Sequence, residues 1–332
     1  DNLYQYDANT TLQLGQFFPQ NRVNIPLFLG YSESFANPQY NPMDPDVPLT
    51  RALDNAGSSA ERDSIKHISQ DYTRRKSLNL TNVRLNRLEG TPKFYDIENV
   101  SVSYSFSEQF SRNIKTDTLI QRNVRGGLTY NYNTQPRNVR PLQNVQWLSN
   151  PYLRIIRDFN FSYYPNQVAF QTELIRTYQE RKLRNIHNPS LIMTPSVAKD
   201  FYWNRNYTLN WNLTQGLRFD FNARNTALID EPDVLGPNEI RIVDRRRYPD
   251  EYSMWRDTIW DNMKSFGKNT QYTHQFNLTY TVPINKIPIF NWITSSARYS
   301  GNYMWNAGKR IPDTDQGTVI DQGNIIQNSN TM

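Results

Sequence analysis

The chain has 332 residues, a formal net charge of +6 and no cysteine. The lack of cysteine excludes a disulfide scaffold, a thiol enzyme and a thiolate metal site. The mean hydropathy is low, −0.77, but the aromatic content of 13% argues against a disordered chain, because disordered chains have few aromatic residues. No apolar run approaches the roughly 18 residues that a membrane-spanning helix needs. The charges are scattered, so we expect no nucleic-acid partner. The chain starts without a targeting segment, and we expect a processed chain or a piece of a longer protein.

Alternation of apolar and polar residues with period two predicts about ten strands. Many of them exceed the 5 or 6 residues typical of globular proteins. In chain order, the predicted strands cover residues 10–18, 25–31, 78–88, 100–107, 124–133, 167–178, 203–213, 217–223, 271–282 and 293–305.

Three short helices are predicted between the strands. Ser58 and Glu61 form a capping box for a helix over 59–71. Residues 154–161 could form a strand or a short helix with Asn150 as N-cap and Pro151 at N1, and the strand count favours the helix. A third helix over 251–266 has apolar residues at helical spacing, with Asp250 as N-cap and Gly267 at its end.

The two faces of the predicted strands differ in chemistry. In 203–213, Trp203 and Leu209 alternate with Asn204 and Asn210. Long strands that are aromatic on one face and amide- or hydroxyl-rich on the other are typical of outer-membrane barrels, whereas soluble sandwiches have short strands. We therefore predict an all-β fold, an antiparallel transmembrane β-barrel segment of about ten long strands with short helices in the loops. A soluble all-β sheet is the alternative.

Connection lengths indicate which ends of the strands share a side of the membrane. Barrels in bacteria have short periplasmic turns and long extracellular loops. We take the short connections 19–24, 214–216 and 283–288 as periplasmic and assign strand directions from both ends of the chain. The two assignments agree only if 134–166 is a single periplasmic connection. We thus assign 37–77 and 227–267 as extracellular loop insertions with helices, and 1–332 as part of one large barrel domain.

No arrangement of residues indicates catalysis, a cofactor or a metal. The three histidines lack ligand spacing, and His274 falls on the apolar face of its strand. Clustered acids near Asp233 and Asp313, and the basic run at 245–247, are interpreted as loop features. We predict that the chain is not an enzyme.

Polar and charged residues on the polar faces are the candidate site. In a barrel they must face the lumen, because an arginine at mid-bilayer costs about 2–4 kcal/mol. The alternative interpretation is cross-strand pairing alone. The candidate lumen-lining residues are Arg125, Glu173, Asn204, Asn206, Asn210, Arg218, Asp220 and Arg224.

Six stretches carry a family resemblance. They are 24–32 (NIPLFLGYS), 37–46 (NPQYNPMDPD), 60–72 (AERDSIKHISQDY), 93–99 (KFYDIEN), 283–288 (PINKIP) and 297–300 (ARYS). The chain resembles the SprA/Sov family, the outer-membrane translocon of the type IX secretion system, over nearly its whole length.

The resemblance implies a function that the strand pattern alone does not. It implies an internal segment of one very large barrel in the bacterial outer membrane, a protein-conducting channel that passes folded cargo proteins to the cell surface and is linked to gliding motility. Implied partners are secreted cargo, a PorV-type shuttle barrel, a plug protein and outer-membrane lipid. No catalytic residues or cofactors are implied. A self-closed porin or transporter barrel and a soluble surface-binding protein are the alternative functions.

Overall fold

The computed structural model describes residues 2–186, 193–232, 251–308, 310–312 and 319–332. These residues form two compact units. Unit 1 comprises 1–86, 102–127 and 174–201, and unit 2 comprises 87–101, 128–173 and 202–332. Each unit is described by itself below.

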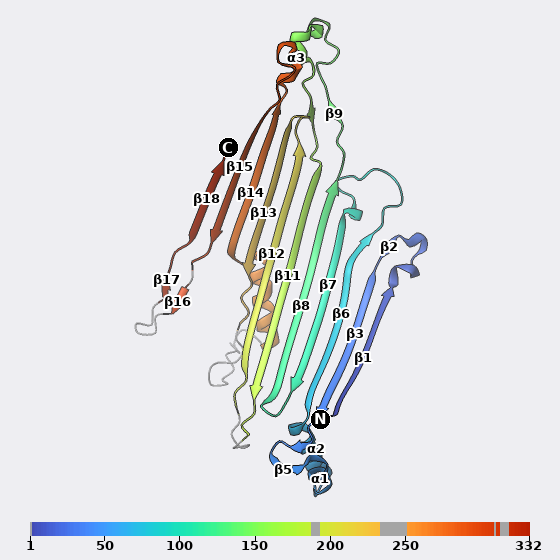
Figure 1. Ribbon diagram of the computed structural model, residues 1–332, viewed down its shortest axis with the longest axis vertical. Helices are drawn as coiled ribbons and strands as arrows, with labels where there is room; N and C mark the ends of the chain where they lie inside the picture. The colour runs from blue at the N-terminus through green and yellow to red at the C-terminus, as the bar shows by residue number, and fades with distance from the viewer. Residues whose placement is uncertain (1, 187–192, 233–250, 309, 313–318) are drawn as a thin grey trace. The chain divides into compact units, whose positions relative to one another are not determined.

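A sheet of twelve antiparallel strands dominates the chain, and its strand order follows the chain order (Figure 1). Eleven strands form the path, and β2 (Val23–Asn24) pairs with β6 outside it. Along the path they are β1 (Asn2–Gln13), β3 (Pro26–Asn37), β6 (Asp71–Leu85), β7 (Val100–Arg112), β8 (Thr116–Asn133), β11 (Gln167–Leu183), β12 (Ser196–Asn212), β13 (Leu217–Leu228), β14 (Lys268–Val282), β15 (Ser295–Asn306) and β18 (Ile325–Thr331).

Three small hairpins lie outside the large sheet. They pair β4 (Tyr40–Asn41) with β5 (Asp44–Pro48), β9 (Asn138–Val139) with β10 (Phe161–Ser162), and β16 (Arg310–Pro312) with β17 (Val319–Asp321).

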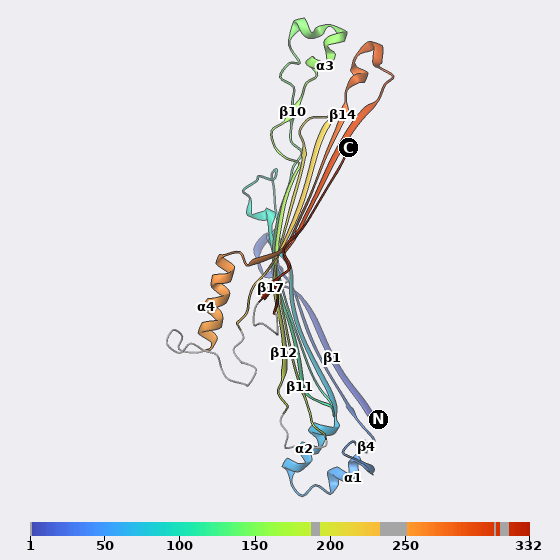
Figure 2. The same cartoon turned by 90° about the vertical axis from the view of Figure 1, so that its left-hand side faces the viewer.

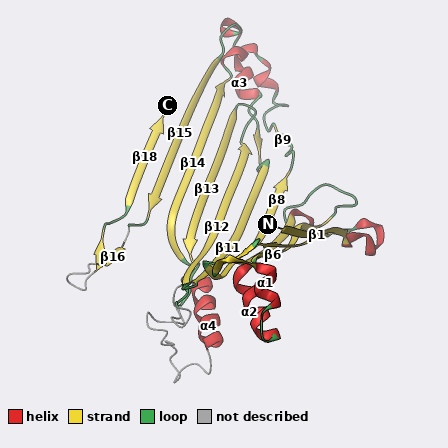
Figure 3. Ribbon diagram, turned by 60° about the horizontal axis from the view of Figure 1, so that its bottom comes forward, coloured by secondary structure: helices red, strands yellow, loops and turns green. Residues whose placement is uncertain are grey.

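The helices all lie in connections between strands (Figure 3). The α-helices are α1 (Leu49–Asp54), α2 (Ser59–Ser69), α3 (Arg154–Arg157) and α4 (Glu251–Lys264). Single 3-10 turns occur at η1 (Leu14–Phe17), η2 (Pro19–Asn21), η3 (Ile97–Asn99), η4 (Gln146–Ser149), η5 (Pro151–Leu153), η6 (Ile284–Lys286) and η7 (Pro288–Phe290). Within the described ranges, no helix is both long and apolar enough to cross a membrane.

The predicted helices are confirmed. Ser58 caps α2, its hydroxyl accepting a hydrogen bond from the Glu61 amide at 3.1 Å. The Asn150 side chain accepts from the Tyr152 amide at 3.0 Å and opens η5 and α3. The α4 helix ends at Lys264, and Gly267 just beyond it has a φ of +70°, in the left-handed region. The predicted cap of α4, at 250, lies outside the described residues. Helix α1 was not predicted, because Pro and Asp dominate the sequence before it.

All ten predicted strands are present, with two differences. The first strand covers Asn2–Gln13 rather than 10–18, since η1 interrupts the alternation after it. The strand β18 was missed, because its seven residues are mostly polar. The predicted antiparallel all-β sheet is confirmed, but the described strands do not form a closed barrel, because the order is open from β1 to β18. That the sheet is a segment of a transmembrane barrel stays a prediction.

The connection between β8 and β11 agrees with the strand count. Residues 134–166 contain β9, β10 and short helices, but no strand of the large sheet. β8 and β11 are neighbours in that sheet, as the alternating directions require. The assignment of the connections to the two sides of a membrane stays a prediction.

Candidate functional site

Strand pairing in unit 2 collects amide and hydroxyl side chains on one face of the sheet. Asn206 lies opposite Arg224, which lies opposite Thr273, and Asn210 lies opposite Asp220. Because partners that lie opposite each other in a ladder point to the same face, this polar face extends through β12, β13, β14, β15 and β18. Its further members are Asn204, Thr208, Asn222, Thr226, Gln275, Asn277, Ser300, Asn302, Gln327 and Ser329.

Much of the polar face is hydrogen-bonded to itself across the strands. The Thr226 hydroxyl donates to Asn204 Oδ1 at 2.9 Å, and the Thr208 hydroxyl donates to Asn222 Oδ1 at 3.1 Å. Asn210 Nδ2 donates to Gln167 Oε1 at 2.7 Å. These donors and acceptors already have partners, so the face can hold water without offering a strong site for a specific ligand.

Charges on this face are partly neutralised. Arg218 Nε lies 2.9 Å from one carboxylate oxygen of Asp220 and 3.0 Å from the other. Both residues are on β13, two positions apart. Arg224, on the same face, lies opposite the neutral residues Asn206 and Thr273. The face therefore has a slight excess of positive charge.

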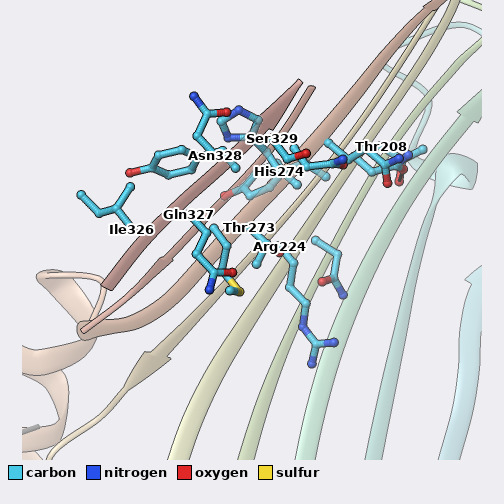
Figure 4. A pocket seen from close by; sticks show the side chains of 16 residues that line it. Thr208, Arg224, Thr273, His274, Ile326, Gln327, Asn328 and Ser329 are labelled. Atoms are coloured by element: carbon cyan, nitrogen blue, oxygen red, sulfur yellow. Dashed lines mark hydrogen bonds between the residues drawn. The ribbon is translucent and has the colours of Figure 1, made fainter. Parts of the chain in front are cut away.

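A shallow groove of about 950 Å³ lies over the five strands (Figure 4). Thr208, Arg224, Thr273, Gln327 and Ser329 are among its lining residues. The lining also includes Tyr207, His274 and Tyr303, from the other face of the strands. The described residues contain no group of three potential metal ligands.

The opposite face of the same strands is aromatic. His274 stacks on Tyr303 with ring centroids 5.1 Å apart, and Phe276 contacts Tyr299 at 5.6 Å. His274 thus lies on the apolar face, as predicted. Tyr207 and Tyr280 keep 40% and 38% of their surface exposed, so the described chain leaves this face uncovered.

Arg205 is the exception on the aromatic face. Its guanidinium lies 5.1 Å from the Trp203 ring and 5.7 Å from the Phe266 ring. It also donates to Asn225 Oδ1 at 2.7 Å and to the Phe266 carbonyl at 3.2 Å. Phe266 follows α4, which stands off one face of the sheet (Figure 2). Arg205 lies in the middle of β12, opposite Asn225 of β13, and these contacts hold its charge beside Phe266.

The connection 134–166 is fastened to the turns at the other end of unit 2. Asn160 is buried, and its Oδ1 accepts from the Gln215 amide at 2.7 Å. Lys286 Nζ lies 3.0 Å from Asp158 Oδ2. Burial would raise the pKa of Asp158, but its hydrogen bond to Lys286 and nearby arginines outweigh burial and hold that pKa below its usual value.

Unit 1 has the same two-faced pattern. On one face, Leu27 and Leu29 lie opposite Leu80 and Leu78. On the other face, Ser32 lies opposite both Asp7 and Arg75. Among these apolar residues, Leu29 keeps 37% of its surface exposed, so the apolar face is uncovered here as well.

Helix α2 packs against the strands of unit 1. Arg184 Nη2 lies 3.5 Å from His67 Nδ1 and 2.8 Å from Asp117. Burial, followed by the charges of Arg112 and Arg184, lowers the pKa of His67, although Asp117 acts in the opposite direction.

Six of the eight candidate lumen residues share the polar face of unit 2. They are Asn204, Asn206, Asn210, Arg218, Asp220 and Arg224. Glu173 lies on β11 within unit 2, and Arg125 lies on β8 within unit 1. Their role as lumen lining stays a prediction. Sequence reasoning missed Gln327 and Ser329, because residues 327–331 are all polar and give no alternation signal.

Some predicted loop features cannot be compared with the structure. The basic run 245–247 and the acids at 233, 313 and 315 lie outside the described residues.

The described residues thus form a large antiparallel sheet whose strands in unit 2 have one polar and one aromatic face. Residues 1–53 match the family SprA_N, described as a motility related/secretion protein. This match supports membership of the chain in the SprA family, as the resemblance predicted. The matched residues contain the stretches 24–32 and 37–46, and the resemblance of the later stretches stays an interpretation. No curated protein matches the chain.

Proposed function

We propose that this chain forms part of a transmembrane β-barrel in the bacterial outer membrane, the protein-conducting channel of a type IX secretion translocon. The channel would pass folded cargo proteins to the cell surface and would be linked to gliding motility. The observation that carries the proposal is the two-faced sheet, in which long strands are aromatic on one face and amide-rich on the other.

The length of the aromatic face supports a membrane location. On β14 the apolar positions run from Tyr272 to Val282, close to the 9–11 residues with which a tilted strand crosses a membrane. Arg205 lies on this face, where a mid-bilayer arginine would cost about 2–4 kcal/mol. Through Asn225, Arg205 lies level with Tyr272, the first residue of this stretch, and its stacking and hydrogen bonds compensate its charge there.

The chemistry of the polar face supports passage rather than capture. Its amides and hydroxyls bond to one another, and Arg218 is paired with Asp220. A protein moving past such a wetted surface forms few bonds that must be broken again. In this proposal, energy is supplied elsewhere, and the partners are secreted cargo, a PorV-type shuttle barrel, a plug protein and outer-membrane lipid.

Single cysteines test the two faces, because the chain itself has none. Asn302 and Tyr303 are consecutive on β15 but belong to opposite faces. In the full-length gene product in native membranes, an impermeant maleimide should label Asn302→Cys and leave Tyr303→Cys unlabelled until detergent is added. Equal labelling of both variants without detergent would favour a soluble sheet and refute the membrane location.

A cross-link distinguishes a large channel from a small barrel that closes on itself. Cysteines replacing Asn9 on β1 and Ser329 on β18 should not form a disulfide if other strands lie between these edges. Thr208 and Asn222 are directly opposite each other and provide the positive control pair. A disulfide between β1 and β18 would mean a barrel of about this many strands, too narrow for folded cargo.

Contact with cargo is tested from the polar face. A photo-reactive residue at Asn222 should cross-link to a secreted protein arrested in transit, whereas the same group at Phe221, on the aromatic face, should not. Cross-linking from both positions or from neither would contradict a conduit along this face.

A further inference from the structure

A row of charged side chains crosses the apolar face of unit 1. Glu33 lies opposite Arg74 on the neighbouring strand. Arg74 Nη2 is 3.9 Å from one oxygen of Glu108, and Arg122 Nε is 2.7 Å from the other. The row thus runs across β3, β6, β7 and β8, on the same face as the leucines of β3 and β6. Because this face is otherwise apolar, the row requires an explanation beyond solvation.

Aromatic rings hold the arginines of the row in place. The guanidinium carbon of Arg74 lies 5.6 Å from the Phe110 ring, and that of Arg112 lies 4.9 Å from the Tyr72 ring. Tyr72 and Phe110 contact each other edge to face at 5.9 Å. Among the described residues, the Nε atoms of Arg74 and Arg112 are buried and have no hydrogen-bond acceptor. Stacking occupies the planes of these groups, and their Nε atoms are buried, so a further partner would bind the Nη atoms at the outer edge of each guanidinium.

The row lies where the apolar part of the strands ends. On β6, Lys76 lies next to the row, opposite Tyr31, and it is followed on the same face by Leu78 and Leu80. The stretch from Lys76 to Leu85, where β6 ends, is close to the 9–11 residues that a membrane-spanning strand needs. If the proposed bilayer location holds, the row therefore lies at the level of the lipid headgroups, with tyrosines beside it as in an interfacial belt.

The charge of the row identifies the chemistry of its partner. Arg74, Arg112 and Arg122, with the neighbouring Lys76, outnumber the acids Glu33 and Glu108. Both acids are already engaged, Glu33 by the hydroxyl of Tyr31 at 3.0 Å and Glu108 by arginine. Arginine binds phosphate through two parallel hydrogen bonds, a geometry that its fixed fork suits.

We propose that this row binds the phosphate groups of anionic saccharolipids in the outer leaflet, with Arg74 and Arg112 as the principal ligands. This inference rests on the proposed function, since it requires that the apolar face of unit 1 contacts a bilayer. It adds a lipid-binding site on the face opposite the conduit. Binding there would fix the depth of the strands in the membrane.

The test compares two lipids on the purified full-length protein in neutral maltoside micelles. The probes are bis-phosphorylated lipid A and the same lipid after removal of both phosphates. For the phosphorylated probe, Arg74→Gln or Arg112→Gln should raise the dissociation constant about tenfold, the factor expected for losing a charge-assisted hydrogen bond. The matched control is Arg75→Gln, one residue along on the opposite face, where Arg75 Nε donates to Gln109 Oε1 at 3.2 Å. This control should bind normally.

Further measurements separate the possible failures. Arg74→Lys should retain more affinity than Arg74→Gln, and unchanged thermal unfolding would show that the variants fold. Equal affinity for both lipids, equal loss in Arg75→Gln, or displacement of the lipid by millimolar inorganic phosphate would overturn the inference. Carbonate extraction of native membranes tests the bilayer location separately. Extraction-resistant protein without phosphate-dependent binding would refute this inference alone, whereas extracted protein would refute the proposed function.

Discussion

Replacing Asn160 by alanine should release the connection 134–166 from the end of unit 2. Asn160 is 7% exposed. Its Oδ1 accepts from the Gln215 amide at 2.7 Å and from Asn138 Nδ2 at 3.0 Å, and its Nδ2 donates to the Asp158 carbonyl at 2.9 Å. One side chain thus joins the connection to itself and to the turn between β12 and β13.

The size of the effect follows from the bonds that alanine cannot make. A buried donor left without an acceptor costs about 1–3 kcal/mol, and an ordinary hydrogen bond contributes about 0.5–1.5 kcal/mol. The Asn160→Ala change leaves the Gln215 amide unpaired and removes two weaker links as well. We expect the free energy of local opening to fall by about 2–3 kcal/mol, because part of the loss will be recovered by water at this chain end.

Amide hydrogen exchange on the purified full-length protein measures this opening. A loss of about 2–3 kcal/mol corresponds to exchange that is roughly 30 to 160 times faster in 134–166 and at the turn 214–216. Asn144→Ala, at an exposed position of the same connection, is the matched control and should leave exchange unchanged. If Asn160→Ala exchanges at the wild-type rate, or if the two variants behave alike, the connection is not held by this side chain.

Two further predictions concern one strand and one helix. An ideal Cβ at Gly301 would lie 2.5 Å from the Phe276 ring, so Gly301→Ala should destabilise the protein by about 1–3 kcal/mol. The control Gly126→Ala, where the new Cβ has no atom within 4 Å, should not destabilise it. Equal unfolding temperatures of the two variants would contradict the close contact. The lowered pKa of His67 means that the unfolded chain takes up a proton first, so stability near α2 should decrease as pH falls below about 6.5. Protease cleavage near α2 should therefore become faster in the wild-type protein as the pH is lowered from about 7.5 to about 5.5. The increase should be smaller in the His67→Gln variant. An equal increase in both proteins would refute the role given to His67.

The sequence predicted most of the strands because each of their faces has a constant chemistry. The alternation in 203–213 or 271–282 is visible without knowing any neighbour. The helix N-caps could be predicted for the same reason, since the Ser58 and Asn150 side chains accept hydrogen bonds from backbone amides two or three residues away. These are local properties, and local reasoning finds them.

Features that depend on partners distant in sequence could not be predicted in this way. The shared face of Asn210 and Asp220 follows from register, which the turn 214–216 sets. Closure of the sheet depends on whether β1 and β18 meet, and no residue of either strand encodes that alone. The charged row around Glu108 was missed because Arg74 and Arg122 lie on different strands, so alternation made each look like an isolated exception.

The sequential strand order has a consequence for how such a protein can be assembled. Every long strand pairs with the strands before and after it along the large sheet. A growing sheet of this kind needs only its most recent edge as a template, and each addition pairs a new strand with the sheet strand that precedes it in the chain. Assembly can therefore proceed one hairpin at a time, in the order of synthesis. The newest edge is then the aggregation-prone surface at every stage and the part that a folding factor must shield.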